Sequence, residues 1–284
     1  MFNLKADLHI HTYFSDGDQS PEEIAALARE KGLAYISVCD HDVITAYPRL
    51  SAACAKEGVG LIQGVEISVN WEKQWLHLLA YDFDPENEGM QMLLCKSRLE
   101  LAEFDDGVIY NMAADFPQLD LAEYEIYQRP RERGGWKALN YIYDKGLSEN
   151  LLDGMKYEKK YSGTTPVLPE ISKACRVIKA AGGVPILAHP GDWWMNEAAD
   201  APAKFTVLKE LGLAGVECYY PRHSTEFTRM CVDFCEKNGM YITCGGDCHG
   251  EFARRREPGA VDRYLGVMDV DMASLRLWQG WAKQ

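Results

Sequence analysis

Short apolar runs that end in polar clusters alternate along the chain with stretches of helical periodicity. Seven of these runs have the length and the β-rich composition of strands. Strands that alternate with helices are typical of βα units built around a parallel sheet or barrel. The pattern therefore predicts an α/β fold with a barrel-like sheet. The expected strands cover residues 4–11, 34–40, 59–68, 76–83, 184–190, 214–220 and 240–247.

The helix after the first of these runs has the clearest boundaries. Ser20 is a typical N-cap, Pro21 suits the first helical position, and Glu23 completes a capping box. Gly32 is placed to end this helix. Similar signals predict three more helices, from Thr45 to Gly58, from about Pro169 to Gly182, and from Ser224 to Asn238 and Gly239.

The alternation stops between about residues 85 and 166, where helix-like stretches follow one another without a clear strand. We therefore expect an inserted helical subdomain at residues 86–165, and a barrel made of residues 1–85 and 166–284. The centre of the insertion, YQRPRERGGWK, gathers Arg129, Arg131, Arg133 and Lys137 just before a predicted helix. Free N–H groups at a helix start favour anions, so this segment is a candidate anion-binding site. A solvated charged loop is the alternative.

The composition indicates a folded protein of the cell interior. The 284 residues are 47% hydrophobic, and the formal net charge of −13 disfavours binding to duplex nucleic acid. The nine cysteines form no CxxC pair, as expected in a reducing cytoplasm. The start of the chain lacks the pattern of a signal peptide, and no apolar run reaches the ~20 residues of a membrane span. We expect a cytoplasmic protein without a membrane segment, and its oligomeric state stays open.

The seven histidines are concentrated at the predicted strand ends. Six lie within or directly after a strand, and His223 follows one by three residues. In a β/α barrel these ends converge on a single face, where active sites are built. We therefore expect the imidazoles to meet. The six are His9, His11, His41, His77, His189 and His249.

The residues around these imidazoles favour metal binding as the explanation for their position. His9 and His11 are two apart on a strand and so face the same side. Asp247 and His249 repeat this spacing in the last strand region. Glu66 lies in an apolar strand, where a carboxylate is costly unless it is paired or bound to metal. A bridging ligand explains it most simply.

Each of the other candidate metal ligands also has an interpretation that involves no metal. Asp16 follows the first strand and could ligate a metal or cap a turn. His41, between Asp40 and Asp42, could ligate or belong to a capping turn, and His77 could be a core histidine. His189 precedes a proline that fixes the direction of the chain. Nitrogen and carboxylate ligands without thiolate favour Zn²⁺, Mn²⁺ or Fe, and more than four ligands indicate more than one ion.

Six motifs follow one another along the chain, namely HIH, DHD, GVEIS, a strand histidine, AHPG and GDCHG. Their order resembles that of the polymerase-and-histidinol-phosphatase (PHP) family of metal-dependent phosphoesterases. The resemblance covers residues 4–84 and 167–266. It implies a distorted seven-stranded β/α (TIM-like) barrel that holds two or three divalent metal ions. It also implies three ligand groups: His9, His11, Glu66 and Asp247 for one ion, Glu66, His77 and His189 for a second, and Asp16, His41 and His249 for a third.

The same resemblance implies roles for residues around the metals. His223, in YYPRHS, matches a phosphate contact or general acid of the short phosphatase branch. Asp16 stands where other branches often carry histidine, which makes the chain similar to the smaller nucleotide- and sugar-phosphatase branch. That branch commonly reads Arg-Pro-His in the insertion, whereas here Arg131 follows Arg129 and Pro130. A cyclic phosphodiester of a sugar therefore joins the nucleotide and sugar phosphomonoesters as a possible substrate.

We therefore hypothesise that the chain is a phosphoric ester hydrolase acting on a small phosphorylated metabolite. Two ions bridged by Glu66 would share a hydroxide for attack on phosphorus, with Asp247 beside it. His223 would protonate the leaving group or hold the phosphoryl group. Three cations of the insertion would bind the remaining substrate charge, namely Arg129, Arg131 and Lys137.

Two other functions remain open at this stage. Metal-dependent amidohydrolases also begin with HxH and end with an aspartate, but the chain shows no lysine at a strand end suited to carboxylation. A non-catalytic metal-binding module is the other alternative. Trp193 and Trp194 could stack on a base or belong to the core, and the run Arg254 to Arg256 is expected to be a solvated loop.

Overall fold

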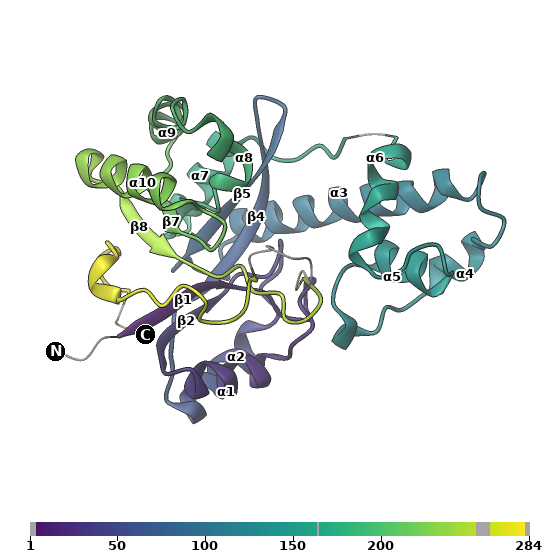
Figure 1. Ribbon diagram of the computed structural model, residues 1–284, viewed down its shortest axis with the longest axis horizontal. Helices are drawn as coiled ribbons and strands as arrows, with labels where there is room; N and C mark the ends of the chain where they lie inside the picture. Colours follow the sequence, from purple (N-terminus) through teal and green to yellow (C-terminus); the bar gives the residue numbers. More distant parts are fainter. Residues whose placement is uncertain (1–3, 164, 254–261, 282–284) are drawn as a thin grey trace.

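The first part of the chain forms a parallel three-stranded sheet covered by two helices (Figure 1). The computed structural model describes residues 4–163, 165–253 and 262–281, so the run Arg254 to Arg256 lies outside the described residues. The apolar faces of the two helices pack with the sheet in one buried cluster. The elements are β1 (Lys5–Ile10), α1 (Pro21–Glu30), β2 (Leu33–Val38), α2 (Tyr47–Glu57) and β3 (Gly60–Leu61), with strand order β1-β2-β3.

The second sheet has five strands of mixed direction. Its order is β4-β5-β6-β7-β8; β5 is antiparallel to both β4 and β6, whereas β6, β7 and β8 run parallel. A buried cluster with residues from both sheets, including Leu8 and Leu79, shows that the sheets share an interior. The strands are β4 (Gly64–Trp71), β5 (Gln74–Tyr81), β6 (Val184–Leu187), β7 (Gly215–Tyr219) and β8 (Tyr241–Cys244).

Helices pack on the other side of the five-stranded sheet. Their apolar residues join the strands in the largest buried cluster. These helices are α7 (Ile171–Ala180), α8 (Gly191–Trp194), α9 (Ala201–Glu210) and α10 (Thr225–Asn238), and η3 (Met195–Glu197) and η4 (Met272–Ser274) are short 3₁₀ turns.

The expected seven-stranded barrel is wrong. In the described part of the chain the strands form two separate sheets, and only isolated bridges such as Ile10–Cys248 and His41–Glu66 link them. The physical reason is a hairpin that joins β4 and β5. Glu72 and Lys73 both adopt positive φ angles, 51° and 67°, which is the geometry of a two-residue hairpin turn. The chain therefore returns antiparallel as β5, and the parallel order is interrupted.

The helix boundaries follow the predicted capping signals closely. The Ser20 hydroxyl accepts a hydrogen bond from the Glu23 N–H, and the Glu23 carboxylate accepts one from the Ser20 N–H, so the capping box is present. Gly58 and Gly239 end α2 and α10 in the left-handed region, with φ of 70° and 66°. Only glycine adopts this conformation without strain. These local predictions are confirmed.

Between β5 and α7 the chain is helical and extends to one side of the two sheets (Figure 1). The first half of α3 packs in the main core through Met90 and Leu94, whereas its second half packs in a separate cluster through Val108 and Met112. One long helix thus joins two cores. The elements are α3 (Glu88–Met112), α4 (Leu121–Ile126), η1 (Arg131–Arg133), α5 (Lys137–Asp144), η2 (Leu152–Tyr157) and α6 (Glu158–Tyr161). Among the described residues, no helix has the length and apolar character required to cross a membrane.

Candidate metal centre

The structure brings the nine residues predicted as metal ligands into one cluster between the two sheets. They come from strands β1, β4 and β5 and from the loops after β1, β2, β6 and β8. Three groups within the cluster have ligand atoms that all lie within 4.8 Å of one another. These groups are His9, His11, Glu66 and Asp247; His11, Asp16, His41 and His249; and His41, Glu66 and His77. The ninth residue, His189, joins them through Glu66, because its Nε2 lies 2.9 Å from Oε1 of that carboxylate.

Glu66 is the centre of the cluster and is fully buried. Its Oε2 lies 3.2 Å from Nε2 of His9, Nε2 of His11 and Nδ1 of His41. Its Oε1 lies 3.1 Å from Nδ1 of His77. Burial alone would raise the pKa of Glu66, but the surrounding imidazoles hold it well below its usual range. Glu66 is therefore ionised, and each of its oxygens faces a different set of histidines.

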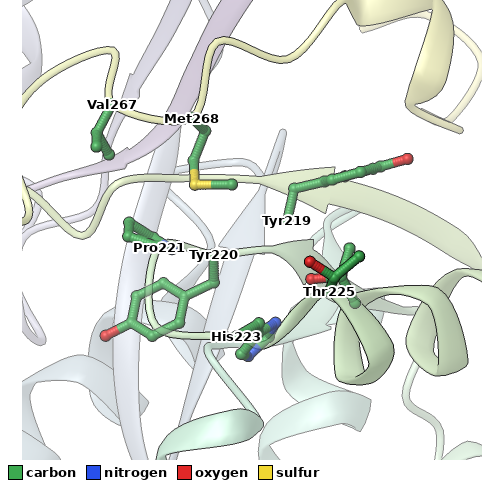
Figure 2. A pocket seen from close by; sticks show the side chains of 8 residues that line it. Tyr219, Tyr220, Pro221, His223, Thr225, Val267 and Met268 are labelled. Atoms are coloured by element: carbon green, nitrogen blue, oxygen red, sulfur yellow. The ribbon is translucent and has the colours of Figure 1, made fainter. Parts of the chain in front are cut away.

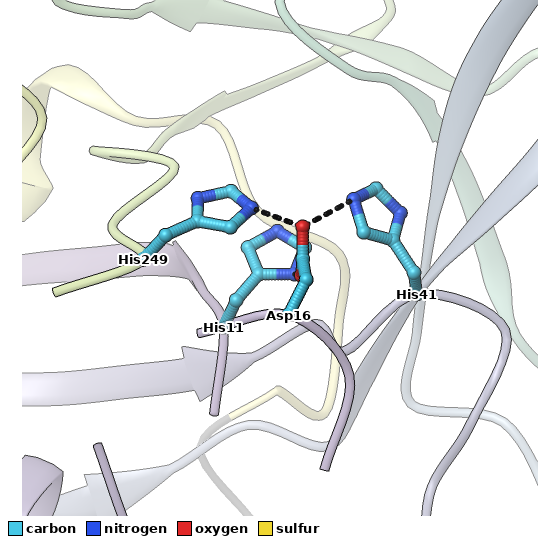
Figure 3. Close-up of side chains that lie close together, drawn as sticks. All are labelled: His11, Asp16, His41 and His249. Atoms are coloured by element: carbon cyan, nitrogen blue, oxygen red, sulfur yellow. Dashed lines mark ion pairs between the residues drawn. The ribbon is translucent and has the colours of Figure 1, made fainter. Parts of the chain in front are cut away.

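Asp16 organises the outer part of the cluster (Figure 3). Its Oδ2 lies 3.2 Å from Nε2 of His249 and 3.8 Å from Nε2 of His41, and its Oδ1 lies 3.5 Å from Nδ1 of His11. The His11 and His249 rings stack at 4.0 Å between centroids. His11 and His41 thus turn one ring nitrogen toward Asp16 and the other toward Glu66.

Burial keeps two of these imidazoles neutral. It lowers the pKa of His11 to about 4, with the charge of His249 as a second cause, and it lowers the pKa of His41 to about 3. Neutral imidazoles retain a nitrogen lone pair, which is the form that binds metal ions. His9 behaves differently, because the carboxylates of Glu66 and Glu217 outweigh its burial and raise its pKa well above the usual value. The space between these carboxylates therefore favours positive charge.

Unpaired polar atoms at the centre fit the binding of divalent cations. Glu66 Oε2, His77 Nδ1 and His189 Nδ1 are buried and form no hydrogen bond among the described residues. A buried polar atom that forms no hydrogen bond is costly even beside an oppositely charged group, and a metal ion would remove that cost. The Nε2 atoms of His9 and His11 face each other at 3.2 Å, as two ligands of one ion would. The donors are nitrogen and carboxylate oxygen, a set suited to Zn²⁺, Mn²⁺ or Fe.

Carboxylates outside the predicted set support the ligands. Glu217, on β7, lies with Oε1 3.1 Å from Nδ1 of His9. Asp7 accepts hydrogen bonds from the N–H groups of Gly246 and Gly266, at 2.9 Å and 2.8 Å, and thereby anchors the loop that carries Asp247. Sequence reasoning missed both, although Glu217 gave the same signal as Glu66, a carboxylate within an apolar strand.

Comparison with known proteins decides the family. The model of the PHP domain matches residues 7–157, more than half of the chain. The chain belongs to the PHP family. A 5'-3' exoribonuclease of Haemophilus influenzae is 32% identical over 86% of this chain and 90% of its own length. The predicted resemblance to the family is confirmed, and with it the prediction of a metal-dependent phosphoester hydrolase.

Two further relatives show the range of PHP reactions. A phosphoribosyl 1,2-cyclic phosphate 1,2-diphosphodiesterase of Eggerthella lenta is 26% identical over 87% of this chain and 95% of its own length. A 3',5'-nucleoside bisphosphate phosphatase of Chromobacterium violaceum is 23% identical over 90% of this chain and 91% of its own length. A solved structure from Bifidobacterium adolescentis, described as a metal-dependent phosphoesterase, shares the fold with a TM-score of 0.78 at 23% identity, over 95% of this chain and 96% of that one.

In this PHP chain the helical segment between β5 and α7, the predicted insertion, contacts the loop between β1 and α1 that carries Asp16. The Arg129 guanidinium donates hydrogen bonds to the carbonyls of Tyr13 and Ser15, and the Gly135 N–H donates one to the Asp16 carbonyl at 2.7 Å. Gly135 has a φ of 64°, which allows this close approach. Arg129 thus ties the insertion to the metal centre through backbone groups.

The other predicted substrate contacts lie around the cluster rather than in it. The Arg131 guanidinium lies over the Phe14 ring at 5.4 Å, and Lys137 Nζ lies 3.9 Å from the centre of the Tyr124 ring. His223 accepts a hydrogen bond from the Gly191 N–H through Nε2, and its Nδ1 donates to the Cys218 carbonyl. Among the described residues, none of these side chains forms a hydrogen bond or ion pair with the nine clustered residues.

Two more residues near the centre gave no sequence signal. The Arg263 guanidinium forms an ion pair with Oδ2 of Asp247, although 15 residues separate them along the chain. The Tyr220 hydroxyl donates to Oδ2 of Asp192 at 3.0 Å and lies 3.5 Å from Oδ2 of Asp247. Asp192 Oδ2 is in turn 3.6 Å from Nδ1 of His189. These contacts hold the outer oxygen of Asp247 away from the cluster while its Oδ1 faces His11 at 3.2 Å.

A pocket of about 350 Å³ lies beside the cluster (Figure 2). Tyr220 forms part of its wall, while the hydroxyl of the same residue bonds to Asp192 near the metal centre. His223 lines the pocket with its nitrogens already bonded to backbone groups. The lining is thus mainly aromatic and aliphatic, and consists of Tyr219, Tyr220, Pro221, His223, Thr225, Thr228, Val267 and Met268.

The two adjacent tryptophans have different surroundings. Trp194 is buried in the core, where its indole N–H donates to Gln74 at 3.2 Å. Trp193 is partly exposed, and its ring lies 4.8 Å from that of His189 and 6.0 Å from that of His77. Only Trp193 is therefore placed to meet a ligand at the metal centre.

Gly245 offers a test of how tightly the centre is packed. A Cβ at this position would lie 2.2 Å from the His9 Cβ and 2.6 Å from Glu217 Oε1. We expect Gly245→Ala to destabilise the fold by about 1–3 kcal/mol, because the backbone would have to shift. Urea unfolding of the metal-free protein measures this effect. Gly107→Ala, whose Cβ would meet Ser162 O at an ordinary 3.8 Å inside α3, is the control and should be neutral or stabilising. Equal stability of both variants would contradict the prediction.

Proposed function

We propose that this chain hydrolyses a phosphoester of a small ribose-containing metabolite. The substrate is a nucleotide or sugar phosphomonoester or a cyclic phosphodiester. One observation carries this proposal: eight other candidate nitrogen and carboxylate ligands surround a fully buried Glu66. The relatives named above support the substrate class, because each name refers to a phosphoester of a nucleotide, an RNA or a phosphoribosyl group.

We assign the nine ligands to three ions, as the family resemblance implies. Glu66 would bridge two ions, because its two oxygens face different histidines. The sets are His9, His11, Glu66 and Asp247; Glu66, His77 and His189; and Asp16, His41 and His249. Mn²⁺, Zn²⁺ or Fe fits these donors. When bound, such ions supply Lewis acidity and make a water molecule nucleophilic near neutral pH.

The chain's own residues then orient the reaction. Glu66 and Asp247, the residues we place next to the reacting atoms, each direct a carboxylate oxygen toward Nε2 of His11, at 3.2 Å in both cases. Arg263 balances the charge of Asp247 from the outer side. For His223 to act on the leaving group, one of its bonds to Gly191 or Cys218 would have to open. Trp193 is placed to stack on a sugar or base.

We further propose that residues 86–165 form a substrate-binding subdomain on the two-sheet body of residues 1–85 and 166–284. Arg129 attaches this subdomain to the loop of Asp16, and Arg131 and Lys137 would bind the charge of the substrate that lies away from the metals. All nine cysteines are free, which supports a cytoplasmic setting.

The experiment that tests the function is a substrate panel with metal-reconstituted protein. It compares a 3',5'-nucleoside bisphosphate, a cyclic ribose phosphate, p-nitrophenyl phosphate, bis-p-nitrophenyl phosphate, a short single-stranded RNA and a set of amides. Release of inorganic phosphate or of a phosphomonoester from at least one small phosphoester supports the proposal. Turnover of amides alone, or of no compound, would refute it.

Arg131→Ala tests the proposed role of the insertion. We expect KM to rise about tenfold with little change in kcat, because a lost charge-assisted contact of roughly 1.5 kcal/mol that is equal in substrate and transition state affects only binding. Steady-state kinetics on the best substrate of the panel measures both constants. Arg133→Ala is the matched control, since Arg133 already pairs with Asp144 at 2.6 Å. An unchanged KM for Arg131→Ala would remove this residue from the binding site.

A further inference from the structure

Glu217 lies directly behind the metal centre on β7, a strand that supplies none of the nine ligands. Its side chain is fully buried. Its Oε1 and Oε2 lie 3.1 Å and 3.3 Å from Nδ1 of His9, on the side of that ring that faces away from Glu66. A buried carboxylate at this distance from a ligand imidazole acts on the ligand rather than on the substrate.

The contact determines which nitrogen of His9 carries a proton. An ionised carboxylate only accepts hydrogen bonds, so Nδ1 of His9 must be the donor. The Nε2 atom of a neutral His9 is then unprotonated, and it faces His11 and Glu66, each at 3.2 Å. Glu217 thus selects the form of His9 whose lone pair points into the cluster.

The same carboxylate also holds a second ligand. Oε2 of Glu217 accepts a hydrogen bond from the backbone N–H of His189 at 2.8 Å. His189 has a φ of 24°, an uncommon value for a residue with a side chain, so its backbone needs support from its surroundings. Gly245 packs closely against the Glu217 carboxylate, because a Cβ at this position would lie 2.6 Å from Glu217 Oε1.

We infer that Glu217 is a positioning residue that sets the tautomer of His9 and fixes the backbone of His189, and so couples two of the proposed metal sites. The inference rests on the proposed function, since it takes both histidines as ligands. It assigns to one buried carboxylate the task of orienting two ligands, one on β1 and one in the loop after β6.

Glu217→Gln is a sharp test because glutamine has nearly the same shape. A side-chain amide has one acceptor oxygen and one donor nitrogen. If the oxygen accepts from the His189 N–H, the amide donates to Nδ1 of His9 and moves its proton to Nε2, where it blocks the lone pair. If the amide is reversed, two donors face each other at His189. We therefore expect the apparent zinc Kd of at least one site to rise about 10–100-fold.

The measurement is a zinc titration against a chromophoric chelator, with circular dichroism and thermal melting of the metal-free protein to show that the variant folds. Glu158→Gln is the matched control, because Glu158 is a partly buried carboxylate whose Oε1 is buried without a hydrogen bond, but it lies in α6, far along the chain from the nine clustered residues. Wild-type zinc affinity in folded Glu217→Gln would overturn the inference. The same affinity loss in Glu158→Gln would also overturn it, because the effect would then be general.

A second measurement does not depend on the variant. Nitrogen-15 NMR of histidine side chains in the zinc-loaded wild-type protein should show His9 protonated at Nδ1 and bound through Nε2, and the opposite assignment would overturn the inference.

The proposed function and the role of Glu217 can be refuted separately. A wild-type protein that binds zinc but hydrolyses no phosphoester refutes the function alone, whereas active wild-type protein with normal zinc affinity in Glu217→Gln refutes the role of Glu217 alone. Failure of the wild type to bind zinc, manganese or iron refutes both.

Discussion

Replacing Glu66 by glutamine is expected to lower kcat/KM by more than about 100-fold. Loss of a residue that only supports a metal ligand typically costs 10–100-fold, and Glu66 contacts five imidazoles directly. An amide nitrogen would replace one acceptor oxygen with a donor, so one side of the cluster would lose its bridge and its negative charge. Kinetics at saturating metal, with metal content determined on the same samples, measures the effect.

The control for Glu66→Gln must remove the same negative charge at a position outside the cluster. Glu170→Gln serves this purpose, because Glu170 accepts a hydrogen bond from the Asn70 amide at the far end of β4. We expect Glu170→Gln to retain wild-type activity and metal content. A Glu66→Gln protein with normal kcat/KM and full metal content would refute the bridging role.

The location of the metal centre could be predicted from the sequence even though the barrel was wrong. The prediction for His9, His11, Asp247 and His249 depended only on the alternation of side chains in a strand and on strand ends meeting at one edge. Strand ends meet in two open sheets as well as in a closed barrel, although Asp247 and His249 lie in the loop after β8 rather than on a strand. The predicted position of the metal centre therefore did not depend on the predicted topology of the sheet.

The error itself has a local cause. Hairpin turns with positive φ are usually marked by glycine or asparagine, but here Glu72 and Lys73 adopt that conformation. Because the turn signal was missing, the antiparallel pairing of these two strands was not predicted. His77 nevertheless reaches the centre, because the antiparallel pairing places it opposite Ser68, two residues from Glu66.

The substrate contacts could not be derived in the same way. Arg131 and Lys137 are placed by where the insertion docks, and that depends on contacts far apart in sequence, such as the Gly135 N–H with the Asp16 carbonyl. The position of His223 could not be derived from the sequence for the same reason. Its two hydrogen bonds join the start of α8 to the end of β7, and neither partner is a polar side chain that a motif would reveal.

Removal of the metal ions is expected to abolish activity and to lower the melting temperature. A ligand that binds only the folded protein stabilises it by about 2.7 kcal/mol when its concentration is 100 times its Kd. For a chain of this size, that corresponds to a shift of roughly 5–10 °C for each ion. The ions matter to the fold because, without them, Glu66 Oε2 and Nδ1 of His77 and His189 stay buried without a hydrogen bond.

Dialysis against a chelator, followed by calorimetry and phosphate-release assays, measures both effects. Addition of Mn²⁺ or Zn²⁺ should restore them, whereas Ca²⁺ should not, because the cluster offers mostly imidazole nitrogen and Ca²⁺ prefers oxygen. Glu66→Gln is the internal control, and its melting temperature should respond less to added metal than that of the wild type. If chelation leaves both the activity and the melting temperature of the wild type unchanged, the clustered residues serve packing alone, and the phosphoesterase mechanism proposed here is wrong.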